Sequence, residues 1–191
     1  MKHRVFIAIN LPSSAKSELA KTQKVVSAIF DEQCPIKWEK PEKLHITVAF
    51  LGYLTDQQEK NVGELLYGLS RNCEKMELAV EKIEYGPPNI FPPRLLWARL
   101  RENSALRELH GILAEGLGKI GINLESKDFI GHITLGRISQ WAFKSLDPQC
   151  QVDVAQDLEL KFRAESLDLM ESKLGRGGSV YSLKQKYILR E

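Results

Sequence analysis

The sequence predicts an α+β protein. Segments rich in β-branched and aromatic residues often follow one another directly, and only three amphipathic segments interrupt them. This order lacks the regular strand–helix repeat of a parallel α/β sheet and favours antiparallel strands with helices packed against them. No low-complexity linker divides the 191 residues. We therefore expect residues 1–191 to form one domain, either a single compact unit or two lobes that share a core.

The first elements follow from local patterns. Arg4 to Asn10 is β-branched and apolar, which predicts a strand. Pro12, Ser13 and Ser14 then offer a turn and a side-chain cap for a helix that reaches about Phe30. The side chains expected on its buried stripe are Ala15, Leu19, Val26 and Ile29.

The later elements follow from the same reasoning. Thr55 and Asn103 can each cap a helix, and the helices after them place apolar residues at the spacing of one buried face. Four of the eight prolines fall within residues 86–94, which predicts an ordered loop between two strands. Further strands are expected at residues 36–38, 44–51, 76–85, 95–100, 129–137, 158–165, 167–173 and 180–189.

Charge and cysteine usage exclude several classes of protein. The 27 basic and 25 acidic residues leave a formal charge of +2. The chain therefore has no broad positive field, and any binding of nucleic acid must depend on a local group of residues. Cys34, Cys73 and Cys150 are odd in number and far apart, which argues against a disulfide framework and a clustered zinc site. This usage favours a reducing cytoplasm. No apolar run approaches the roughly 18 residues of a membrane span, so we expect no membrane association.

One short repeat stands out, His-Ile-Thr-Val at 45–48 and His-Ile-Thr-Leu at 132–135. Along a strand, residues i and i+2 project from the same face, roughly 6.5 to 7 Å apart. His45 should therefore share a face with Thr47, and His132 should share one with Thr134. The apolar residues between them should face the core, and strict alternation adds Phe50 to that buried set.

Two imidazoles and two hydroxyls suit the opening of a cyclic phosphodiester. In-line attack needs a base to take a proton from water and an acid to protonate the departing ribose oxygen. Imidazole titrates near pH 6.5, so one neutral ring and one protonated ring can coexist. Thr47 and Thr134 can hydrogen-bond the non-bridging phosphate oxygens. This scheme needs no metal and no other cofactor, and the nearly symmetric motifs do not say which histidine is the acid.

Two other interpretations of the histidines compete with this one. A lone strand histidine is usually structural or merely exposed. A zinc site usually needs three or four ligands, and neither motif has a third histidine or a close cysteine beside it. The repetition of the whole pattern favours a catalytic pair.

At these residues the chain resembles the two-histidine phosphoesterase superfamily, and within it the RNA 2′,3′-cyclic phosphodiesterases once named 2′-5′ RNA ligases. The resemblance spans nearly the whole chain. Besides the two motifs it covers residues 4–9 with 11–12, Trp38, residues 50–52, 93–97 and 136–137, and positions 172, 174, 178 and 181. It implies a bilobal fold in which two antiparallel sheets, related by a pseudo-two-fold axis, face a central cleft. The helices would lie outside, with one motif in each lobe. It also implies that His45 is the general acid and His132 the general base, and that the product is a 2′-phosphate.

Arg137 is a further candidate for substrate contact. It lies five positions after His132, where strict alternation would bury it, and an unpaired buried guanidinium is very unfavourable. We therefore expect the strand to end or bulge at Gly136, which returns Arg137 to the cleft. There it can meet phosphate or stack on a base, and a surface salt bridge is the alternative.

Three other candidates are weaker. Phe50 occupies the equivalent place after His45, where it can either stack on a nucleobase or pack in the core. Arg94, in the proline-rich loop, can contact phosphate or remain solvated. Arg176 can overhang the cleft, although the glycine-rich segment around it lacks a P-loop ending and favours a hairpin turn. The tryptophans are interpreted mainly as packing residues: Trp38, Trp97 and Trp141.

The sequence therefore predicts a cytoplasmic hydrolase that opens 2′,3′-cyclic phosphates at RNA ends or on small cyclic nucleotides. A monomer with no obligate protein partner is the default expectation. ATP-independent joining of RNA ends through a 2′-5′ linkage is the reverse chemistry in the same cleft, and the excess of water favours hydrolysis. A binding module without turnover is the third alternative, which the intact histidines and threonines disfavour.

Overall fold

The computed structural model of the protein describes residues 2–30, 35–124, 128–146, 154–175 and 178–191. These residues form nine strands, four α-helices and one 3-10 helix. All of the strand pairs are antiparallel, which confirms the α+β class. Cys34 and Cys150 lie outside the described residues, and Cys73 is a free, half-buried thiol.

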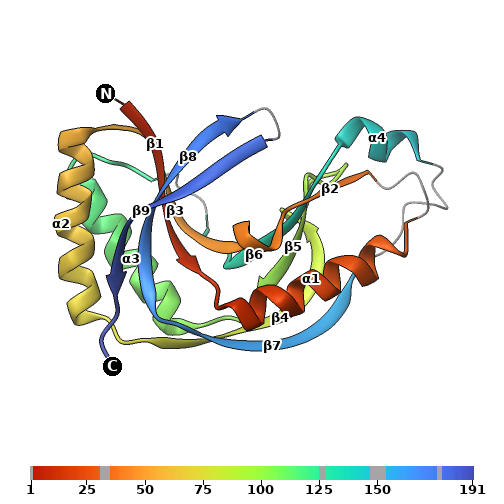
Figure 1. Ribbon diagram of the computed structural model, residues 1–191, viewed down its shortest axis with the longest axis horizontal. Coiled ribbons are helices and arrows are strands. Elements are labelled where there is room, and N and C mark those ends of the chain that lie inside the picture. The colour runs from red at the N-terminus through yellow and green to blue at the C-terminus, as the bar shows by residue number, and fades with distance from the viewer. Residues whose placement is uncertain (1, 31–34, 125–127, 147–153, 176–177) are drawn as a thin grey trace.

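The nine strands belong to one sheet with two halves (Figure 1). The first half runs in the order β3 (His45–Thr55), β1 (Lys2–Asn10), β8 (Ser166–Gly175) and β9 (Gly178–Ile188). The second half runs in the order β6 (His132–Ile138), β5 (Leu95–Leu100), β4 (Met76–Gly86) and β7 (Gln156–Ala164), with the short β2 (Ile36–Trp38) also paired to β6.

The two halves meet at one residue pair, Ile46 of β3 and Ile133 of β6. This contact refines the expectation of two separate sheets, because hydrogen bonding at the two motif strands joins them into one. Counted outward from the junction, each half has four antiparallel strands, so the strand order agrees with a pseudo-two-fold relation.

The helices pack against this sheet and enclose its core. Helix α1 (Ser13–Ser27) contacts β7 and the 3-10 helix η1 (Pro41–Lys43). Helix α2 (Asp56–Asn72) contacts β3, β8 and β9, and α3 (Ser104–Lys119) contacts α2 and β3. One large cluster of buried apolar side chains runs through both halves. In Figure 1 the β8–β9 hairpin and the short helix α4 (Gln140–Ser145) project at the top of the molecule, away from α1 and α3.

Helix ends differ in how well local sequence predicts them. The caps predicted at Thr55 and Asn103 are confirmed, since Thr55 Oγ1 accepts from the backbone N–H of Gln58 and Asn103 Oδ1 accepts from Leu106. The serine cap predicted for α1 is wrong because Pro12, which has no side-chain acceptor, occupies that position.

Two further corrections concern α1 and α4. Helix α1 ends at Ser27 rather than near Phe30, and Ile29 is 43% exposed rather than part of the buried stripe. Helix α4 was not predicted, because its six residues are too few to show a helical period.

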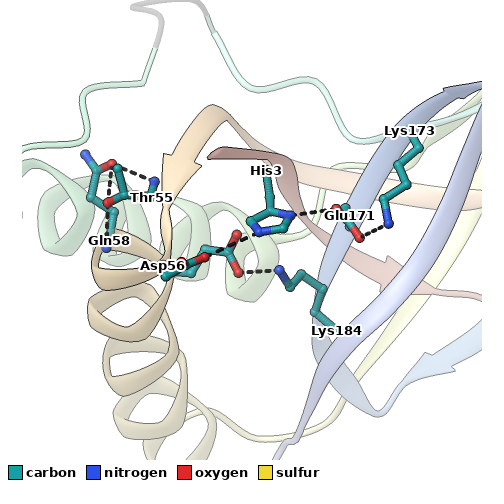
Figure 2. Close-up of polar contacts among 8 residues, drawn as sticks. His3, Thr55, Asp56, Gln58, Glu171, Lys173 and Lys184 are labelled. Atoms are coloured by element: carbon teal, nitrogen blue, oxygen red, sulfur yellow. Dashed lines mark hydrogen bonds and ion pairs between the residues drawn. The ribbon is translucent and has the colours of Figure 1, made fainter. Parts of the chain in front are cut away.

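A polar cluster fastens the N-terminal end of β1 (Figure 2). His3 Nδ1 lies 2.8 Å from Glu171 Oε1 on β8, and His3 Nε2 lies 3.3 Å from Asp56 Oδ1 at the start of α2. Lys184 of β9 pairs with Glu59 of α2 at 2.5 Å. These contacts lie at the opposite end of β1 from Asn10, which pairs with His45. His3 is therefore a structural residue.

Candidate active site

The junction of the two halves decides where the motif side chains lie. Ile46 and Ile133 are fully buried on the helix side of the sheet. Their neighbours therefore project from the opposite face. Extending the register by one residue each way sets His45 across from Thr134 and Thr47 across from His132. The two histidines then lie on a diagonal, where Cα atoms are roughly 7 to 8 Å apart.

Both histidine rings are held in the same way. His45 Nδ1 lies 2.6 Å from the carbonyl oxygen of Lys43, and His132 Nδ1 lies 2.8 Å from that of Ile130. A carbonyl only accepts, so each Nδ1 carries a proton and each neutral ring leaves the Nε2 lone pair available. His45 Nε2 lies 3.1 Å from Thr47 Oγ1, which donates to it when the ring is neutral. In both rings Nε2 is therefore the atom that exchanges protons.

Burial lowers the pKa of both imidazoles from the ordinary value. For His45 the Lys43 carbonyl and the carboxylate of Glu39 act in the opposite direction, while the cations Lys16 and Arg137 lower the pKa further. For His132 the Ile130 carbonyl opposes burial, and the charge of His45 lowers the pKa. The two rings therefore lie close enough for the protonation of one to disfavour protonation of the other.

Aromatic rings enclose the two imidazoles. The ring centroids of Phe6 and Tyr181 lie 5.1 and 5.2 Å from that of His45, and Tyr181 meets the imidazole edge-on at 85°. The indole of Trp97 lies 4.2 Å from His132. These contacts partly shield each ring from water, although both histidines remain half-buried, and this shielding lowers both pKa values.

A bulge in β6 carries Arg137 to the same face as the catalytic candidates. Thr134 pairs with Trp97 and Gly136 with Leu96, so Leu135 is an extra residue on β6. Leu135 and Gly136 are both buried, and alternation restarts with Arg137 exposed. A Cβ at Gly136 would lie 2.4 Å from a methyl of Ile36, so only glycine permits this close approach of β2. The bulge predicted at this position is confirmed.

The equivalent bulge in β3 exposes Phe50. Thr47 pairs with Ala8 and Ala49 with Ile7, which makes Val48 the extra residue. Phe50 is 71% exposed, and its ring centroid lies 6.3 Å from that of Phe6. The prediction that Phe50 packs in the core is therefore wrong. Phe50 and Arg137 occupy the same place, five residues after their histidines, in the two halves.

Arg137 is paired in this structure. Its Nε donates to Glu39 Oε1 at 3.0 Å, and the arginine side chain is 56% exposed. Because the charges of both residues act on His45, the pair lies at the edge of the histidine site. The salt bridge and a role in phosphate binding are compatible, since a guanidinium has several donors.

The remaining candidates are not brought to the histidines by a described contact. Arg94 is exposed at the end of the proline-rich loop, where its backbone N–H bonds Gly86 and its carbonyl accepts from Ile138. Arg176 lies outside the described residues. Trp97 is buried and Trp38 partly buried, as predicted, whereas Trp141 is 79% exposed and is not a packing residue.

Three residues near the histidines were missed by sequence reasoning. Glu39 and Lys16 act on His45 through their charges, and Lys16 Nζ also donates to the carbonyl of Glu42 at 3.0 Å. Gln23 is buried and donates to the carbonyls of Glu39 and Leu135, both at 2.8 Å. No signal in the sequence itself pointed to these residues. In the structure, Gln23 stands out because it is a polar residue buried on the otherwise apolar face of α1.

Among the described residues no group of three or more His, Cys, Asp or Glu side chains is arranged to hold a metal ion. In the same part of the chain no helix combines the length and the apolar character that a membrane crossing requires.

Known proteins resemble this chain in sequence and in fold. A family model described as "LigT like Phosphoesterase" matches residues 9–97, which include the first motif. A protein of Archaeoglobus fulgidus is 27% identical, over 88% of this chain and 85% of its own length, and is named RNA 2′,3′-cyclic phosphodiesterase. A Methanocaldococcus jannaschii protein of the same name is 26% identical, over 96% of this chain and 99% of its own length.

Solved structures show the same architecture. The crystal structure of a protein from Thermus thermophilus matches with a TM-score of 0.82 at 26% identity, covering 98% of both chains. The structure of Escherichia coli LigT complexed with 3′-AMP matches with a TM-score of 0.77 at 22% identity, covering all of both chains. The chain is therefore similar to LigT-like phosphoesterases, in sequence over residues 9–97 and in fold over nearly its whole length.

Proposed function

We propose that the protein hydrolyses 2′,3′-cyclic phosphates at RNA ends, or on small nucleotides, to 2′-phosphates by acid–base catalysis with His45 and His132. The observation that carries the proposal is the Ile46–Ile133 pair, because it sets both imidazoles diagonally on one face. The names of the relatives support the substrate class, since those proteins are called RNA 2′,3′-cyclic phosphodiesterases.

The chemical step needs one proton removed and one supplied. His132 takes a proton from water at Nε2 while the water oxygen forms a bond to phosphorus. The bond from phosphorus to the ribose 3′ oxygen breaks, and His45 donates the Nε2 proton to that leaving oxygen. Assignment of the acid to His45 follows the family, and Glu39 supports it because its carboxylate favours the protonated ring.

The other site residues stabilise the charge that develops on phosphate. Thr47 and Thr134 alternate with the two histidines across the junction, so their hydroxyls can donate to non-bridging oxygens. Arg137 lies on the same face after the β6 bulge and adds a positive charge. Removing one such donor typically lowers kcat by about 10²- to 10³-fold.

The test is incubation of the EDTA-treated protein with 2′,3′-cyclic AMP, with chromatographic identification of the monophosphate formed. We expect 2′-AMP. His45→Ala and His132→Ala should each lower kcat by about 10²- to 10⁴-fold, because each removes one proton-transfer group. His110→Ala is the matched control and should retain activity. It removes an imidazole of α3 that stacks on the ring of Phe129. Retention of near-normal rate by either site variant would reject the acid–base pair.

A further inference from the structure

The proline-rich loop and α4 form an exposed aromatic surface beside the strand of His132. Trp141 is 79% exposed on α4, and Phe91 is 72% exposed in the loop between β4 and β5. Exposed aromatic rings on neighbouring segments offer faces on which nucleic-acid bases can stack. We call Phe91, Trp141, Arg94 and Lys144 the α4 platform.

The platform is held rigidly in place. Gln140 Nε2 donates to the carbonyl of Pro92 at 2.9 Å, which fastens the start of α4 to the loop. Phe143 is buried beneath the surface, with its ring 5.6 Å from Tyr85 and 6.0 Å from Phe91. Side chains on a fixed base lose little conformational freedom when a ligand stacks on them.

The charge of this region complements a nucleic acid. Residues 86–97 and 129–146 contain no aspartate or glutamate, although the whole chain has 25 acidic residues. They contain the exposed cations Arg94, Arg137 and Lys144. Arg137 is paired with Glu39, whereas no ion pair within the described residues involves Arg94 or Lys144. Exposed aromatic rings next to cations are the combination that binds single-stranded nucleic acid, because bases stack while phosphates pair with the cations.

The platform is continuous with the candidate active site. Strand β6 begins at His132 and leads through Ser139 into α4 (Figure 1). After the bulge it carries Arg137 on the same face as His132. The eight residue steps from His132 to Gln140, at about 3.3 Å each, place the start of α4 at most about 26 Å from His132. One nucleotide bound between the histidines does not reach that far, whereas an RNA strand of several nucleotides does.

We propose that the α4 platform is a substrate subsite that binds single-stranded RNA several nucleotides upstream of the terminal cyclic phosphate. This inference rests on the proposed function and adds to it a preference for oligonucleotides over mononucleotides. Trp141 supplies the main stacking surface, and Arg94 and Lys144 contact the backbone phosphates.

The test compares substrates of increasing length in wild type and Trp141→Ala. The substrates are 2′,3′-cyclic AMP and oligoadenylates of two, four, six and eight nucleotides that end in a 2′,3′-cyclic phosphate. In the wild type, kcat/KM should rise with length and then level off. Trp141→Ala should leave kcat/KM for cyclic AMP unchanged and lower it about fivefold or more for the longer substrates, the scale of a lost stacked base.

Matched variants separate stacking from other effects. Trp141→Phe should retain most of the preference for long substrates, because a phenyl ring still stacks. Tyr67→Ala removes a ring that is 58% exposed on α2 and should change nothing. Quenching of tryptophan fluorescence by a 2′-phosphorylated octanucleotide gives a readout independent of turnover, and Trp141→Phe should lose most of that quenching.

Several results would overturn the subsite. Equal loss of activity on cyclic AMP and on the octanucleotide, or no loss on either, would remove the platform from RNA binding. A wild-type dimer that Trp141→Ala converts to a monomer in sedimentation would identify the surface as a contact between copies of the chain. Failure of the wild type to hydrolyse any of the substrates would instead reject the proposed function itself.

Discussion

His45 and His132 have the same hydrogen-bonding arrangement but different surroundings. Each Nδ1 donates to the carbonyl two residues earlier in the chain. Glu39, Lys16 and Arg137 all act on His45, whereas the neighbouring charge that acts on His132 is His45 itself. The symmetry of the two motifs is therefore broken by residues outside them.

The pH dependence of kcat/KM should reflect the lowered pKa values. The general base is protonated, and therefore inactive, at a pH below its pKa. The general acid is deprotonated, and therefore inactive, at a pH above its pKa. Because burial lowers the pKa of both His45 and His132 from about 6.5, the bell-shaped profile should be centred on the acid side of that value. Arg137→Gln removes a cation that lowers the pKa of His45, so the alkaline limb should move to higher pH.

Rates measured on 2′,3′-cyclic AMP across the pH range, in wild type and Arg137→Gln, would check this expectation. An unmoved alkaline limb, or one that moves to lower pH, would show that His45 does not titrate in that limb.

Phe50 should contribute to nucleotide binding through its exposed ring. Phe50→Ala should weaken binding of 2′-AMP by about 1 to 3 kcal/mol, the usual worth of a base stacked on an aromatic ring. Isothermal titration calorimetry would measure the change. Tyr53→Ala is the control, because Tyr53 is also on β3 and is 64% exposed. Equal affinities for Phe50→Ala and wild type would exclude stacking.

The sequence could place some of these residues and not others. Period-two alternation places His45 and Thr47 on one face, and Gly136 gives a visible reason for a bulge before Arg137. The matching bulge in β3 contains Val48 and Ala49, which carry no such signal. Alternation therefore misplaced Phe50, whereas it gave the correct face for the catalytic candidates.

At the scale of secondary-structure elements, the last strand is part of the His45 environment. Tyr181 of β9 contacts the rings of both His45 and Phe6. Lys43, the last residue of η1, donates through Nζ to the carbonyl of Ser179 at 2.6 Å and so links β9 to the turn before His45. A strand far away in sequence thus fixes the orientation of the first motif.

Removal of the Tyr181 ring should change the titration of His45. Burial is the main cause of the lowered pKa, so Tyr181→Ala should raise the pKa of His45 toward its ordinary value. Nuclear magnetic resonance of the imidazole ring protons would follow the shift. Tyr181→Phe keeps the ring and should titrate as wild type does, and Val180→Ala controls for a change at an exposed neighbour. A pKa that is the same in all four proteins would remove Tyr181 from this role.

Most elements, but not their partners, were accessible from sequence. Strong periodicity and side-chain caps gave α2 and α3. Helix α4 was missed because six residues contain fewer than two turns. The contact between β9 and His45 depends on strand order in the sheet, which no local pattern encodes.

At the scale of the whole molecule, α1 bridges the two halves. It follows β1 of the first half and places Gln23 against the carbonyls of Glu39 and Leu135 in the second. The core is also continuous across the junction. We propose that residues 1–191 behave as one domain and unfold together.

Urea unfolding followed by circular dichroism and by tryptophan fluorescence should give coincident transitions. Gln23→Leu should lower the free energy of unfolding by about 1 to 3 kcal/mol, because the part-buried carbonyl of Glu39 loses the Gln23 donor. The carbonyl of Leu135 also loses its bond from Gln23 but keeps the backbone N–H of Glu39 as a donor. Gln57→Leu, which removes an exposed side-chain bond to Asn61, should have little effect. Two separated transitions in the wild type would mean that the halves are independent domains.

The bilobal arrangement followed from the resemblance, but the union of the halves into one sheet did not. The two halves are joined through one residue pair, Ile46 with Ile133. The position of a single pair cannot be predicted from composition or periodicity. The location of the histidines on one face was predictable, whereas their diagonal register required the coordinates.

The strand order also bears on how the polypeptide matures during synthesis. Strand β1 is synthesised before the other eight strands, yet it lies between β3 and β8, and β8 starts only at Ser166. The half that contains His45 therefore cannot close until β8 has been translated, while β4 to β6 are already available to pair. Throughout that interval one edge of β1 stays open, which makes it the segment where a chaperone would be most useful to the nascent chain.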